Sequence, residues 1–117
     1  MIPVLFIRGK NGYVYCSLNK DNEQSRRFIE EMNPQRVKFS FVSSGDLLSA
    51  KLPFDVYAGE DAFPSKEGDV FLSSDNTLSI CLTDGERKGA LLSRTRYSKE
   101  KILALTGEAQ ANLEWPE

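Results

Sequence analysis

Apolar and polar residues alternate through much of this chain, which is the pattern of β-strands buried on one face. The clearest case is the segment 36–42, in which Val37, Phe39 and Phe41 share one face. An Asn-Gly pair at 11–12 separates the first two runs, and this pair favours a hairpin turn. Pro53 limits the strand that precedes it. We expect strands at 4–8, 13–18, 36–42, 47–52, 68–72, 78–83, 90–97 and 109–115.

Two segments have the features of helices. The first is predicted over 23–32, with Asp21 as the N-cap, because Gln24 lies three residues on in the capping-box position. Its apolar stripe consists of Phe28, Ile29 and Met32. The second is predicted over 99–106, capped by Ser98 and ended by glycine 107.

Two other segments have no clear pattern. Residues 54–67 predict an ordered surface loop anchored by Phe54, Tyr57 and Phe63, and loops of this length are often functional. We interpret its carboxylates as solvated, since they lack the spacing of a calcium loop. Residues 84–89 place two glycines around charged side chains, which resembles an anion-binding nest. A turn is the interpretation that we favour there.

Strands joined mostly by hairpins favour closure, because closure removes exposed strand edges. We therefore predict one mainly β domain over residues 1–117. It is a closed or nearly closed antiparallel β-barrel of about eight strands, and two short helices plug its open ends. Residues 68–82 form its central hairpin.

Charge changes the functional expectation. The chain has 15 basic and 17 acidic residues and a net charge of −2, which argues against a nucleic-acid partner. It has no basic run that would anchor it to a membrane. The apolar opening is followed by Arg8 and Lys10 and is not preceded by cations, so we do not expect a secretory signal. We expect a cytoplasmic location. Cys16 and Cys81 are expected to be buried free thiols.

Histidine is absent from the sequence. This excludes Ser-His-Asp and Cys-His machinery and zinc bound by histidine. We therefore predict no catalytic residue, no metal ligand and no cofactor.

The order of elements and five particular stretches of sequence give a further expectation. These stretches are the hairpin end at Leu18-Asn19, the Phe28-Ile29 helix, the Leu52-Pro53 strand end, the Glu67-Gly68-Asp69-Val70 stretch and the aliphatic strand 78–82.

In these stretches the chain resembles the cyclophilin-like fold, and most closely its small, uncharacterised prokaryotic branch. The resemblance covers nearly the whole chain. It implies a barrel, and it raises prolyl isomerisation because true cyclophilins catalyse that reaction. Isomerase sites use an arginine on a barrel strand, beside phenylalanine and glutamine. Neither a Phe-His-Arg nor a Gln-Gly-Gly-Asp-Phe stretch occurs here, so no catalytic residue is carried over.

Three functions remain open. The first is a non-catalytic protein that binds a peptide or small ligand, with Arg94, Arg96 and Tyr97 as its contacts. The competing interpretation of those three residues is a solvated barrel surface. The second function is weak prolyl isomerisation. The third is a homodimer or other interaction subunit, formed through the 54–64 loop or a barrel face that exposes Tyr13 and Tyr15.

Overall fold

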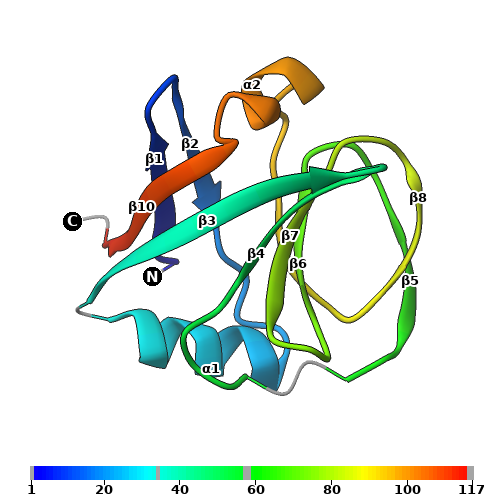
Figure 1. The fold of residues 1–117 in the computed structure, drawn as a ribbon. Helices are drawn as coiled ribbons and strands as arrows, with labels where there is room; N and C mark the ends of the chain where they lie inside the picture. The colour runs from blue at the N-terminus through cyan, green and yellow to red at the C-terminus, as the bar shows by residue number, and fades with distance from the viewer. Residues whose placement is uncertain (1, 34, 57–58, 116–117) are drawn as a thin grey trace.

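Antiparallel pairing joins eight strands into one sheet, in the order β2-β1-β10-β3-β4-β7-β6-β9 (Figure 1). The structure is a computed structural model that describes residues 2–33, 35–56 and 59–115. The strands of the large sheet are β1 (Val4–Gly9), β2 (Tyr13–Ser17), β3 (Arg36–Ser44), β4 (Leu47–Lys51), β6 (Asp69–Ser73), β7 (Thr77–Cys81), β9 (Ala90–Arg94) and β10 (Gly107–Glu114). The remaining elements are α1 (Glu23–Met32), α2 (Lys99–Leu103), β5 (Ala62–Ser65) and β8 (Gly85–Lys88). The predicted fold class, a nearly closed antiparallel barrel with two helices, is confirmed.

The edge strands β2 and β9 complete the barrel without a regular ladder. The backbone N–H of Asn19 donates to the carbonyl of Leu92 at 2.9 Å. The side-chain amides of Asn19 and Asn22 both donate to the carbonyl of Leu91, at 3.0 and 3.1 Å. Two asparagine side chains thus satisfy one backbone carbonyl, that of Leu91, which an open edge would expose.

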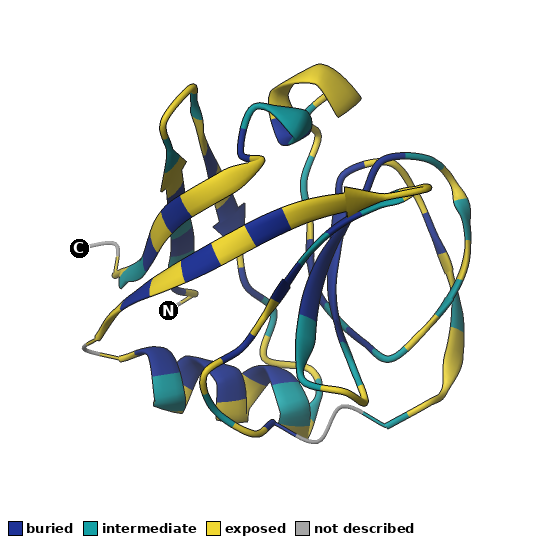
Figure 2. Ribbon diagram, in the orientation of Figure 1, coloured by how far each residue is buried: buried dark blue, intermediate teal, exposed yellow. Residues whose placement is uncertain are grey.

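The barrel interior holds the core, as the alternation of burial along β3 and β10 shows (Figure 2). Val37, Phe39 and Phe41 point inward as predicted, and their polar neighbours are exposed. Helix α1 lies across one end of the barrel and buries the expected apolar stripe (Figure 1). The same core includes Ile102 of α2 and Leu105, at the end where α2 lies.

The N-cap prediction for α1 is wrong by one residue. Asn22, and not Asp21, caps the helix: its side-chain oxygen accepts the backbone N–H of Ser25 at 2.7 Å. The same Asn22 donates its amide to Leu91, which an aspartate could not do. Asn22 therefore both caps α1 and bonds the carbonyl of Leu91, and the second contact requires its side-chain amide.

Several predicted boundaries also differ. The strand expected over 90–97 ends at Arg94, and the helix expected over 99–106 ends at Leu103. The final strand begins at Gly107 rather than at 109. A register shift between Val70 and Phe71 buries adjacent residues of β9, so the strict alternation predicted there is broken. A β-bulge of this kind is set by the partner strand, and local sequence does not indicate it.

The two segments that lacked a pattern pair with each other. Part of the predicted loop forms β5, and the predicted turn at 84–89 contains β8. Together they make a separate two-stranded sheet, which we call the ribbon (residues 62–65 and 85–88). The anchors Phe54 and Phe63 pack on Phe28 and Phe71, with ring centroids 5.9 and 5.5 Å apart. The third predicted anchor, Tyr57, lies outside the described residues.

The ribbon returns to the sheet at Gly89, whose φ is +141°. A Cβ added there would lie 2.0 Å from the carbonyl oxygen of Leu72 on β6. No L side chain fits so close to backbone. Gly45 also has a positive φ, of +60°, but an added Cβ would meet nothing within 4 Å.

We therefore expect Gly89→Ala to lower the free energy of unfolding by more than about 3 kcal/mol, because it adds a backbone clash to conformational strain. The matched control Gly45→Ala should cost only about 1 kcal/mol, the strain alone. Urea unfolding followed by circular dichroism measures both. Equal losses in the two variants would contradict the close approach.

Ser93 has a buried hydroxyl that finds no hydrogen-bond partner in the part of the chain that the structure describes. Ser25, by contrast, is buried with its hydroxyl donating to the carbonyl of Asn19. Because an unpaired buried hydroxyl is destabilising, Ser93→Ala should raise the free energy of unfolding by about 1 kcal/mol. Ser25→Ala should lower it by about the same amount. Chemical denaturation of both variants tests these opposite signs.

Candidate functional site

The outer face of β6 and β7 is covered instead of facing water. Ser79 and Cys81 point away from the barrel core, on the opposite face from Leu78 and Ile80, and Phe71 lies beside them. All three are nevertheless buried. The ribbon lies over this face, with Phe63 set edge-on against Phe71 at 72°. The protein therefore has a second packing layer outside the barrel.

A hollow of about 510 Å³ lies between the ribbon and the large sheet. We call it the ribbon pocket. It is lined by Leu47, Ala62, Phe71, Ser73, Ser79, Glu86, Arg87 and Lys88. Its lining combines apolar side chains and hydroxyl groups with two cations, Arg87 and Lys88, and one carboxylate, Glu86. Apolar surface with a few polar groups is the composition of many small-molecule sites.

Arg87 is the unusual member of this lining. Its Nε and Nη2 atoms are buried and have no hydrogen-bond partner among the described residues. The third nitrogen, Nη1, donates to the carbonyl of Glu86 at 3.2 Å. Gly85 gives the guanidinium its space, since a Cβ added there would lie 2.7 Å from Nη1. The residue as a whole is half-buried, and leaving two donor nitrogens of a charged group out of water without a partner lowers stability.

Cys81 and Ser65 lie close to this guanidinium. Burial raises the pKa of the Cys81 thiol, while the nearby Ser65 hydroxyl and Arg87 guanidinium act in the opposite direction. The Ser65 hydroxyl itself donates to the carbonyl of Gly85 at 2.7 Å. With its pKa raised, the thiol is held in its neutral form, which is a poor nucleophile.

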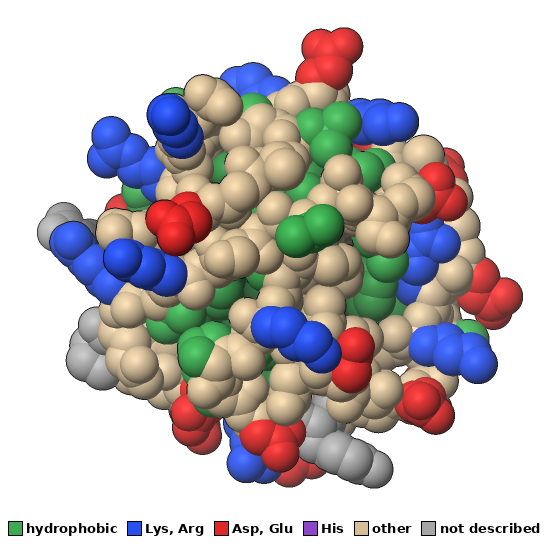
Figure 3. Space-filling model, viewed as in Figure 1, with side chains coloured by type: hydrophobic (Ala, Val, Ile, Leu, Met, Phe, Trp, Pro, Cys, Tyr) green, Lys and Arg blue, Asp and Glu red, His purple; other side chains and the backbone are tan. Residues whose placement is uncertain are grey.

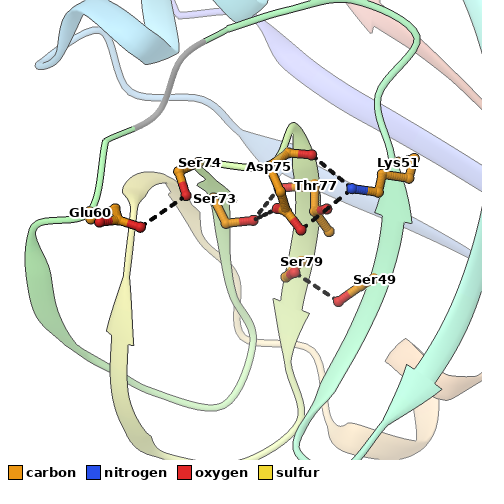
Figure 4. A network of polar contacts seen from close by, with 8 residues as sticks. All are labelled: Ser49, Lys51, Glu60, Ser73, Ser74, Asp75, Thr77 and Ser79. Carbon is orange, nitrogen blue, oxygen red and sulfur yellow. Dashed lines mark hydrogen bonds and ion pairs between the residues drawn. The ribbon is translucent and has the colours of Figure 1, made fainter.

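Polar contacts order the rim of the pocket (Figure 4). The hydroxyls of Ser49 and Ser79 are 2.8 Å apart on neighbouring strands. At the β6–β7 turn, Ser73 donates to the carboxylate of Asp75 at 2.6 Å. The pKa of Asp75 is lowered by its hydrogen bonds to Ser73 and Thr77 first, and also by Lys51, whose Nζ lies 3.4 Å from the carboxylate. The turn beside the pocket is therefore fixed by a charged network.

The three residues predicted as ligand contacts line a different hollow. It has a volume of about 490 Å³ and includes Arg94, Arg96 and Tyr97 together with Asp69. Arg94 lies 3.6 Å from the buried carboxylate of Asp69, which also accepts the backbone N–H of Lys66 at 3.0 Å. The side chain of Arg96 is exposed. The structure thus brings the three residues together, with one arginine already paired.

Tyr97 has a partner within the fold as well. Its hydroxyl accepts the backbone N–H of Tyr15 at 3.1 Å, across the gap between the β9 side of the barrel and β2. Tyr97 thereby helps to complete the barrel seam. Its ring packs against the core.

Comparisons of the chain with protein-family models, curated proteins and solved structures found no match. The resemblance to cyclophilin-like proteins therefore stays a prediction. In the part of the chain that the structure describes, no cluster of three or more acidic, cysteine or histidine side chains could hold a metal ion. The same residues include no helix long and apolar enough to cross a membrane.

Sequence reasoning did not select Arg87. The available signal was the pair of glycines around charged residues at 84–89, interpreted there as a turn. Both glycines serve the site: Gly85 makes room for the guanidinium and Gly89 lets the ribbon approach β6. The pairing of β8 with β5, which positions Arg87, joins segments about twenty residues apart.

Both cysteines are buried free thiols, as predicted. Burial raises the pKa of Cys16 to about 12. An unfolded cysteine loses its proton near pH 8.5. The folded state therefore holds a proton that the unfolded state releases, so this contribution to stability is complete below that pH. It declines as the pH rises toward 12.

We expect Cys16→Val to remove this part of the decline in unfolding free energy between about pH 9 and pH 11, where an ionising cysteine costs up to about 1.4 kcal/mol per pH unit. Urea unfolding of both proteins at each pH measures it. In a Cys81→Ala background, Cys16 should resist iodoacetamide until urea unfolds the chain. Rapid labelling of the native protein would contradict its burial.

Proposed function

We propose that this barrel is a non-catalytic binding protein for a small organic anion, which it holds in the ribbon pocket. The observation that carries the proposal is the pair of buried nitrogens, Nε and Nη2, of the half-buried Arg87, which have no hydrogen-bond partner among the described residues. An unpaired buried charge lowers stability unless something compensates for it. A bound anion would supply that compensation.

The arrangement of the free nitrogens favours a carboxylate. Nε and Nη2 lie on one edge of the planar guanidinium, and this edge donates two parallel hydrogen bonds to a carboxylate. Nη1, on the other edge, is already occupied by the carbonyl of Glu86. The site therefore offers one two-pronged donor.

The remaining lining favours an apolar body on the ligand. Leu47, Ala62 and Phe71 present carbon to the hollow, and its volume of about 510 Å³ is within the range of small-molecule pockets. The hydroxyl of Ser79 is shared with Ser49. An aromatic or aliphatic monocarboxylate matches this combination better than inorganic phosphate does.

Access requires a local movement, because the two free nitrogens are covered. The ribbon pairs only with itself and has no ladder to the large sheet. Its contact with the sheet includes the Phe63–Phe71 pair. A small displacement of the ribbon or of the Arg87 side chain would expose the nitrogens without breaking strand pairing.

The hollow around Arg94, Arg96 and Tyr97 is a second candidate site. It is favoured by the exposed guanidinium of Arg96, which has no ion pair among the residues that the structure describes. Prolyl isomerisation also stays a prediction. A protease-coupled assay on an Ala-Pro peptide tests it, and a rate no faster than the uncatalysed tens of seconds would exclude it.

Benzoate and octanoate should raise the melting temperature of the protein, and the neutral analogue benzyl alcohol should not. A ligand at a hundred times its Kd adds about 2.7 kcal/mol to stability. In Arg87→Met the shift should vanish, while the ligand-free variant should gain about 1 kcal/mol because a buried unpaired charge is removed. Differential scanning fluorimetry and urea unfolding measure the two effects.

The matched control is the double variant Arg94→Gln with Arg96→Gln, which removes the cations of the other hollow. If the carboxylate binds in the ribbon pocket, benzoate and octanoate should still raise the melting temperature of this double variant. If the rise in melting temperature is lost in the double variant and retained in Arg87→Met, the carboxylate binds in the hollow around Arg94 instead. No response to any carboxylate at millimolar concentration would exclude the proposal.

A further inference from the structure

The outer face of β2, β1, β10 and β3 carries an ordered set of side chains that the ribbon pocket does not use. Residues paired across neighbouring antiparallel strands point to the same side of the sheet. One row across the four strands follows from the register: Tyr13, Arg8, Gln110 and Lys38. The next row on the same face is Tyr15, Phe6, Asn112 and Arg36. We call these two rows the platform.

The two rows have the same chemistry on three of the four strands and differ on β1, where one has Arg8 and the other Phe6. An aromatic ring lies on β2, an amide on β10 and a cation on β3. The rows are about 6.8 Å apart, which is two residues along a strand. Most of these side chains are exposed, and Phe6 and Asn112 are partly exposed. The platform is therefore open to a partner.

The aromatic side chains form a single cluster. Phe6 and Tyr15 stack with centroids 4.6 Å apart, and Tyr13 meets Tyr15 edge-on at 5.7 Å. Tyr13 and Tyr15 are 54% and 44% exposed, high values for large rings that already contact one another. The backbone hydrogen bond from Tyr15 to Tyr97 fixes the strand that carries them. The rings are thus held in place before any partner binds.

The charge of the platform is opposite to that of the chain. Its cations are Arg8, Arg36 and Lys38, and the two rows contain no carboxylate. None of the three has an ion-pair partner within the described part of the chain. Lys10 joins Arg8 and Lys38 around a hollow of about 530 Å³ at one end. In Figure 3, several Lys and Arg side chains lie on the left of the view, where the β1–β2 hairpin, β10 and the start of β3 lie, with an Asp or Glu side chain among them.

We infer that the platform binds a single-stranded nucleic acid. Bases stack on exposed aromatic rings, amides bond their edges, and phosphates pair with nearby cations. The net charge of −2 argues against a nucleic-acid partner for the chain as a whole. The register nevertheless places three cations on one face, none of them in an ion pair with a described residue, and puts Glu108 and Glu114 at neighbouring positions of β10. The ribbon pocket plays no part in this site.

The test is fluorescence anisotropy with short labelled oligouridine and oligothymidine at about 50 mM salt. Tyr13→Ala combined with Tyr15→Ala should weaken binding roughly tenfold or more, the loss of stacked bases. Lys38→Gln should weaken binding less and should reduce the slope of log affinity against log salt by about 0.7. The control Lys66→Gln, an exposed cation outside the platform, should change neither. Binding of both oligomers, or of the RNA alone, supports the inference, and the difference reports the role of the 2′-hydroxyl.

Three outcomes would overturn it. One is the absence of binding to either oligomer with the protein in excess. Another is binding that weakens in Lys38→Gln but is unchanged when both tyrosines are replaced, which would indicate charge attraction without a platform. The last is binding to phosphatidylserine vesicles, lost in Lys38→Gln, with no binding to the oligomers. All these variants change exposed side chains, so circular dichroism should show them folded.

Discussion

The approach of Gly89 to the carbonyl of Leu72 is the constraint on which the outer half of this molecule depends. At this point the chain leaves the ribbon and enters β9, and no side chain fits between the two backbones. The N–H of Gly89 also donates to the carbonyl of Asp61 at 3.0 Å, which joins the ribbon strands at the same place. A single residue thus sets how closely the ribbon covers the sheet.

Covering that face has energetic consequences. It buries Phe71 and Cys81 in a second apolar layer, and it covers two nitrogens of Arg87 that have no hydrogen-bond partner among the described residues. The first effect stabilises the fold and the second opposes it. Such an unresolved conflict in an otherwise consistent structure is typical of a site that serves function. The proposed anion would relieve the conflict without any change of fold.

The opposite side of the barrel has no covering layer of this kind. There the sheet is left uncovered, and its regular register aligns the aromatic, amide and cationic side chains of β1, β2, β3 and β10 in rows. The two candidate surfaces are therefore distinct in kind. One is a hollow beside a half-buried arginine, and the other is an open face with several exposed charges.

The sequence by itself determined the inward faces, because alternation of apolar side chains sets which residues a strand can bury. It predicted Val37, Phe39 and Phe41 in the core, the apolar stripe of α1, the burial of both cysteines and the exposure of Tyr13 and Tyr15, all of which the structure has. It also placed Arg94, Arg96 and Tyr97 on one segment, and they line one hollow. Three features are seen only in the tertiary structure: the pairing of β5 with β8, the register shift at β9 and the capping of α1 by Asn22. Each of these depends on a contact between segments distant along the chain, and Arg87 and the platform rows depend on such contacts too. The pattern of apolar and polar residues along the chain does not predict contacts between distant segments.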